Sequence, residues 1–90
     1  MKAMQMMSAL SQPTRWETFR VLVQAGPDGM AATDIAAAVK SSPTTMSAHL
    51  AILVGAKLIS RQKSGRTVTY RADVKSVRAL SEFLARACEK

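Results

Sequence analysis

A mainly α-helical fold with one two-stranded β-hairpin is predicted by three features of this 90-residue sequence. Apolar residues recur at helical spacings of three or four in five separate stretches. One stretch alternates instead, because Val68 and Tyr70 are interleaved with polar residues. Clusters of glycine, proline and serine separate these stretches. A chain of this length forms one domain, so we expect a single domain over residues 1–90, with about five helices.

The centre of the chain predicts two short helices joined by a tight turn. The first covers roughly Ala32–Val39. The second begins after Ser42, a good N-cap, with Pro43 at the first helical position. Its apolar residues are spaced as an inward stripe formed by Met46, Leu50 and Leu53.

The opposite face of this second helix is small, polar and free of acidic residues. It carries Thr44, Thr45, Ser47, Ala48 and Ala51. A helix that lies in a DNA major groove needs such a face, with hydroxyls for phosphates and base edges and methyl groups for thymine. Two amphipathic helices with a turn also occur in many small helical proteins, so the rest of the chain must decide.

Positive charge is concentrated in one segment. The chain has 13 Lys and Arg against six Asp and Glu, a formal net charge of +7. No acid lies between Ile35 and Ala72, and six bases do: Lys40, Lys57, Arg61, Lys63, Arg66 and Arg71. A surface without a binding role would mix the two signs, so this segregation favours a nucleic-acid partner.

The alternating stretch predicts a basic hairpin. One strand begins at Leu58 and Ile59, and Ser64-Gly65 forms the turn, with Gly65 supplying a positive φ. Two isolated strands are marginal in water, so the hairpin must lean on the helices. That would place its basic residues, Arg61, Lys63 and Arg66, beside the polar face of the second central helix.

Two further helices are predicted before the centre of the chain. Met4, Met7 and Leu10 form a short apolar stripe, and Pro13 opens a second helix that runs to about Ala25. In this second helix the spacing predicts that Trp16, Phe19 and Val23 face the core. We expect Arg15 and Arg20 to be solvated, with Arg15 near enough to the helix start to reach a phosphate.

The last predicted helix is capped by Asp73 and runs from Val74 to about Cys88. Its apolar stripe is longer than the core of so small a chain needs. We therefore expect the first and last helices to pair across a two-fold axis and form a homodimer. The predicted interface consists of Met4, Met7, Leu10, Val77, Leu80 and Leu84.

Several function classes are disfavoured. One histidine, His49, and one cysteine, Cys88, cannot form a zinc site, so we expect no metal and no cofactor. The sequence also has no nucleophile–base pair and no phosphate-binding glycine loop, so we expect no enzyme activity. No apolar run is long enough to span a membrane, and a lone cysteine fits the reducing cytoplasm. Cys88 is interpreted as inert, with a thiol switch as the alternative.

The predicted order of elements is that of a winged helix-turn-helix, and three blocks carry a closer likeness. ALSQPTRWETFRVLVQAG resembles the opening of the ArsR/SmtB-type bacterial repressors. DIAAAVKSSPTTMSAHLAILVGAKLIS resembles their recognition unit, and SRQKSGRTVTYR resembles their wing. The likeness covers roughly residues 8–84. It implies a homodimeric repressor of a bacterial promoter that an effector releases from DNA.

The chain also departs from this family. Many members carry Arg where this chain has Ala48, which weakens the case for guanine recognition there. The stretch Met30–Ala36 has no metal-sensing cysteines, the last helix has no histidine, and Cys88 stands alone. Two alternatives stay open: a winged-helix module that binds protein, and a thiol- or metalloid-responsive repressor that uses Cys88.

The sequence thus predicts a regulator that binds double-stranded DNA as a homodimer, with an effector that the sequence does not identify. Ten residues form the predicted DNA contact set: Lys40, Ser42, Thr44, Thr45, Ser47, Ala48, His49, Arg61, Lys63 and Arg66.

Overall fold

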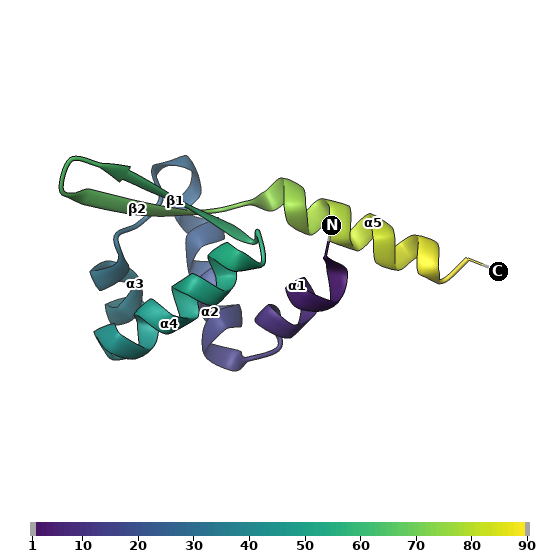
Figure 1. The fold of residues 1–90 in the computed structure, drawn as a ribbon, viewed down its shortest axis with the longest axis horizontal. Helices are drawn as coiled ribbons and strands as arrows, with labels where there is room; N and C mark the ends of the chain where they lie inside the picture. Colours follow the sequence, from purple (N-terminus) through teal and green to yellow (C-terminus); the bar gives the residue numbers. More distant parts are fainter. Residues whose placement is uncertain (1, 90) are drawn as a thin grey trace.

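The computed structural model describes residues 2–89 and has the predicted order of elements (Figure 1). In sequence order they are α1 (Ala3–Leu10), α2 (Pro13–Ala25), the short 3₁₀ helix η1 (Gly26–Asp28), α3 (Ala32–Ala38), α4 (Pro43–Gly55), β1 (Ile59–Ser64), β2 (Thr67–Ala72) and α5 (Val74–Ala87). The predicted fold class, five α-helices with a two-stranded antiparallel wing, is confirmed. No helix among the described residues has the length and apolar character needed to cross a membrane.

The core lies between the first four helices and the base of the hairpin. The predicted inward stripe of α4 is confirmed, because Met46, Leu50 and Leu53 are each at most 1% exposed. They pack in one cluster with Leu22 of α2 and Ile35 of α3, both fully buried. The core therefore fixes which face of α4 points outward.

Helix α2 is rotated relative to the prediction. Phe19 is buried as expected, but Trp16 and Val23 are 46% and 43% exposed, so the prediction that they face the core is wrong. Thr18 and Leu22 are fully buried in their place. The Thr18 hydroxyl can be buried because it donates to a carbonyl one turn earlier, at 2.8 Å. Trp16 stacks against Phe19 from outside, with 6.4 Å between ring centroids.

Helices α3 and α4, which form the helix-turn-helix, are each followed closely by a lysine in the left-handed conformation. Lys40 has φ 57° and Lys57 has φ 65°. The N–H of the next residue then donates to a carbonyl of the last helical turn, Ser41 to Ala36 at 2.9 Å and Leu58 to Leu53 at 3.1 Å. These are Schellman motifs, in which glycine is the usual residue because it has no Cβ.

We expect Lys40→Gly and Lys57→Gly each to raise the free energy of unfolding by about 0.5–1 kcal/mol. The substitution relieves the left-handed strain, and the greater freedom of glycine in the unfolded chain offsets part of that gain. Urea denaturation measures the change. Lys75→Gly, inside α5, should lower stability instead. A decrease for both left-handed positions would contradict the strain argument.

The hairpin, called the wing below, turns one residue later than predicted. Ser64 pairs with Thr67 and is the last residue of β1, so the two-residue loop is Gly65-Arg66 and not Ser64-Gly65. Gly65 has the predicted positive φ, 62°. A positive φ at the first loop position matches a type II′ turn, which suits the twist of a hairpin.

The base of the wing is fastened to the loop before α3. Met30 and Tyr70 exchange two backbone hydrogen bonds of 3.0 and 2.9 Å, which we call the Met30–Tyr70 bridge. Arg71 reinforces it by donating to the Pro27 carbonyl and to Gln62 Oε1, both at 2.7 Å. Arg71 therefore has a structural role, although the sequence placed it among the basic residues of the nucleic-acid face.

Helix α5 leaves the body of the molecule and forms one end of its 49 Å long axis (Figure 1). The predicted cap is confirmed, because Asp73 Oδ1 accepts from the Ser76 N–H at 3.1 Å. Leu80 is only 5% exposed and belongs to the core of the chain itself, so it cannot contribute a free surface to a dimer. The later residues Phe83 and Leu84 are 47% and 41% exposed.

The other residues of the predicted dimer interface also differ in their exposure to solvent. Met4 is 76% exposed, whereas Met7, Leu10 and Val77 pack partly against the core. On α1 and α5, the exposed large apolar residues are therefore Met4, Val74, Phe83 and Leu84 rather than the whole predicted set.

Candidate nucleic-acid interface

The outward face of α4 is exposed along its first two turns. Thr44, Thr45, Ser47 and Ala48 all lie at the surface. No acidic side chain belongs to α4, and the N-terminal end of a helix presents free N–H groups and a partial positive charge. This face can therefore accept an anionic backbone without repulsion.

Two of the predicted contacts also build the start of the helix. Ser42 is the N-cap as predicted, and its Oγ accepts from the Thr45 N–H at 3.2 Å. The same hydroxyl donates to Thr45 Oγ1 at 2.9 Å. The Thr45 hydroxyl hydrogen remains available to a ligand, whereas that of Ser42 is engaged.

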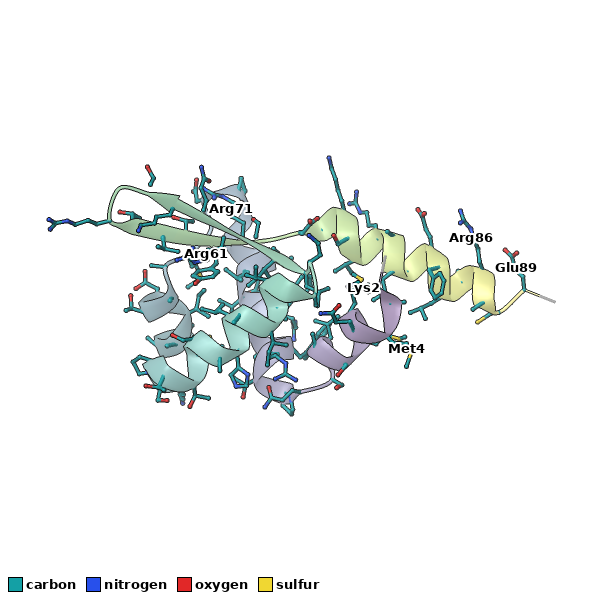
Figure 2. All side chains as sticks on the ribbon, in the orientation of Figure 1. Lys2, Met4, Arg61, Arg71, Arg86 and Glu89 are labelled. Atoms are coloured by element: carbon teal, nitrogen blue, oxygen red, sulfur yellow. The ribbon has the colours of Figure 1, made fainter. Side chains whose placement is uncertain are left out.

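The wing lies beside α4. Ser47 and Ala51 of the helix and Arg61 and Tyr70 of the wing line one groove of about 360 Å³. Figure 2 shows the Arg61 side chain at the wing strands on the side of α4, and Arg71 at their other side. The sequence predicted this juxtaposition, but it missed Tyr70 as a lining residue, although the alternating pattern had placed Tyr70 on the wing.

The outer part of the wing carries more charge. Lys63 and Arg66 are exposed, and Arg66 lies in the two-residue loop. Lys63 stands two residues after Arg61 in β1, so the two side chains lie on one face of the strand. Lys40 is exposed at the end of α3, two residues before the cap of α4. The predicted contacts thus come from the α3–α4 turn, the first half of α4 and the wing.

His49 lies next to this surface but is half-buried. Arg15 Nη1 lies 3.4 Å from its Nδ1. The sequence predicted a solvated Arg15 side chain, and this prediction is wrong. Arg15 is half-buried, and its Nε donates to the Ala9 carbonyl at 2.7 Å. Burial, with a contribution from the Arg15 guanidinium, lowers the pKa of His49 below its ordinary value. This shift favours the neutral form of the imidazole.

Cys88 is an exposed free thiol directly after the end of α5. Within residues 2–89, no three His, Cys, Asp or Glu side chains gather in a group that could bind a metal ion. The thiol and the residues of the predicted DNA contact set lie on different elements of the fold.

Comparisons with known proteins agree with this geometry. A family model described as a helix-turn-helix domain matches residues 10–62. An ArsR-like transcriptional regulator from Rhodococcus sp. RHA1 is 28% identical, with a TM-score of 0.83 over 94% of this chain and 77% of that chain. Comparison with curated proteins gives no match.

Two further solved structures have the same fold. The homodimeric winged helix-turn-helix DNA-binding domain Mb0332 from Mycobacterium bovis is 26% identical, with a TM-score of 0.73 over 92% of this chain and 75% of that fragment. The AntR antimony-specific transcriptional repressor is 28% identical, with a TM-score of 0.68 over 91% and 73% of the two chains. The chain belongs to the helix-turn-helix domain family and is a winged helix-turn-helix transcriptional regulator of the ArsR type.

Proposed function

We propose that this regulator is a homodimeric repressor in which α4 enters the major groove of operator DNA and the wing binds the flanking backbone. The exposed, acid-free face of α4 beside the basic wing is the observation that carries this proposal. Thr44, Ser47 and Ala48 face base edges or nearby phosphates. Arg61, Lys63 and Arg66 bind the backbone through charge.

The dimeric state and the direction of regulation are supported by the similar structures. Mb0332 is described as homodimeric and AntR as a repressor. The uncovered apolar residues of α1 and α5 supply the surface that a second copy would bury. A protein that acts on promoter DNA in a bacterium works in the cytoplasm, and binding of an effector would end repression.

The wing is tested by measuring how DNA affinity depends on salt. Lys63→Ala with Arg66→Ala should weaken binding to all duplexes alike, because backbone contacts carry no sequence information. The slope of log affinity against log salt should fall by about two for each wing, at roughly 0.9 for each phosphate that is no longer neutralised. The matched control is Arg78→Ala with Arg86→Ala, which removes the same charge from α5. Arg86 lies at the end of the molecule opposite the wing (Figure 2).

The recognition helix should respond differently. Ser47→Ala should leave the salt slope unchanged and cost about 1–3 kcal/mol on the operator, with little effect on random DNA. Lys40→Gly should lower the slope, because Lys40 belongs to the predicted DNA contact set. Lys57→Gly should leave the slope unchanged, because Lys57 does not belong to that set. If the wing and α5 variants reduce the slope equally, the wing does not bind phosphate. If neither pair changes the slope and binding instead requires an acidic protein, the protein-binding alternative is favoured.

A further inference from the structure

The two ring nitrogens of His49 have different surroundings. Nδ1 faces Arg15 Nη1 at 3.4 Å. A guanidinium has only N–H donors and no acceptor, so Nδ1 must be the acceptor in this contact. In a neutral imidazole the proton then belongs to Nε2. The contact with Arg15 thus selects one tautomer.

Nε2 is open to a ligand. Within residues 2–89, the hydrogen bond at His49 joins Nδ1 to Arg15, and no buried polar side-chain atom lacks a partner. Nε2 therefore reaches the surface. Thr45 precedes His49 by one helical turn, so its free hydroxyl hydrogen and the Nε2–H lie on the same side of α4.

Arg15 is held in place from two directions. Its backbone N–H donates to Gln12 Oε1 at 2.8 Å, which caps α2. Its Nε donates to the Ala9 carbonyl near the end of α1 at 2.7 Å. The guanidinium is therefore a rigid, charged link from α1 and α2 to the helix that faces DNA. Neither of the two contacts made by the guanidinium itself goes to a carboxylate, so its charge adds to the positive potential there.

We propose that Arg15 is a positioning residue that holds His49 as the neutral Nε2–H tautomer, so that Nε2 donates a hydrogen bond to a DNA phosphate. This inference rests on the proposed binding of DNA by α4. It assigns His49 a role as a neutral donor, and it assigns Arg15 a role in recognition through the ring rather than as a phosphate ligand.

The tautomer is measured directly by ¹⁵N NMR of the imidazole in the free wild-type protein at pH 7.5. We expect an unprotonated Nδ1 and a protonated Nε2, and in Arg15→Met a mixture of the two tautomers. A protonated Nδ1 in the wild-type protein overturns the proposal, as does a pure Nε2–H tautomer in Arg15→Met. Because this measurement needs no DNA, its outcome is independent of the proposed function.

Two substitutions of His49 test the donor. A glutamine amide nitrogen can occupy the position of Nε2, whereas an asparagine amide nitrogen occupies that of Nδ1. His49→Gln should retain operator affinity to within about threefold, and His49→Asn should bind about tenfold or more weakly, as for one hydrogen bond to a charged group. Equal effects of the two variants overturn the donor role.

The salt slope separates a neutral donor from a cation. A neutral Nε2–H releases no counterion, so the slope of His49→Asn should equal that of the wild-type protein. A slope lower by about one for each subunit would show that His49 binds as imidazolium and would overturn the proposal. If Arg15→Met does not fold, the tautomer of the wild-type protein and the comparison of His49→Gln with His49→Asn still test the proposal. Absence of the wing effect alone would contradict the proposed function and leave the tautomer result standing.

Discussion

Gly29→Ala is expected to lower the free energy of unfolding by about 3–5 kcal/mol, because backbone strain and steric overlap add. Gly29 has φ 67° and ψ −167°, a region that is essentially restricted to glycine. A Cβ at this position would also overlap the Tyr70 carbonyl oxygen and come within 2.7 Å of Thr69 Cγ2. The backbone of β2 cannot move away, since Tyr70 is paired with both Arg61 and Met30.

Gly26→Ala is the matched control for this prediction. Gly26 has nearly the same backbone conformation, φ 66° and ψ −153°, but an added Cβ would meet nothing within 4 Å. It should therefore show only the conformational part of the destabilisation, about 1–3 kcal/mol. The difference between the two variants measures the close approach of the loop to the wing. Chemical denaturation of both gives this difference.

The expected damage from Gly29→Ala extends to the wing. The overlap lies beside the Met30–Tyr70 bridge, so the bridge should break first and release the base of the hairpin. Hydrogen exchange should show faster exchange of the Met30 and Tyr70 amides than in Gly26→Ala. Equal unfolding free energies for the two variants would show that the loop does not press on the wing.

The sequence predicts well those features that depend on neighbours in the chain. The start of α4 follows from Ser42 and Pro43, and its buried face follows from the spacing of Met46, Leu50 and Leu53. The cap at Asp73 and the positive φ of Gly65 are equally local. Each signal lies within one or two turns, where propensity and periodicity apply directly.

The features that the sequence did not predict depend on distant parts of the chain. Arg15 and His49 are 34 residues apart, and their contact arises only when α2 packs beside α4. Trp16 and Val23 had a helical spacing, but Thr18 could be buried in their place because its hydroxyl is satisfied within the helix. The left-handed Lys40 and Lys57 give no sequence signal, because lysine is not a typical residue there.

The second half of α5 carries two exposed large apolar residues. Leu80 anchors the helix to the core, but Phe83 and Leu84, about one turn further along α5, are 47% and 41% exposed. A chain of 90 residues buries only a modest core, and the homodimer proposed above would cover these side chains with a second copy of the chain. The surface is narrower than the sequence predicted, since Leu80 is already covered.

Leu84→Asp is therefore expected to give a folded monomer. An unpaired carboxylate buried in the interface would weaken the dimer by about 3–5 kcal/mol, whereas Leu84 is not part of the core of a single chain. Sedimentation should show the monomer, and circular dichroism should show an unchanged helix content. Ala85→Asp places the same group at an exposed position about 100° further around α5 and should remain dimeric.

DNA binding should fall with the dimer for a geometric reason. Two recognition helices related by a two-fold axis reach half-sites about 34 Å apart, one turn of the duplex, and a monomer can bind only one of them. Leu84→Asp should thus bind the full operator more weakly but bind an isolated half-site as a wild-type monomer would. A dimer that persists in Leu84→Asp at micromolar concentration would show that the two copies meet on another surface, and the exposed aromatic side of α2 around Trp16 would then be the next surface to test.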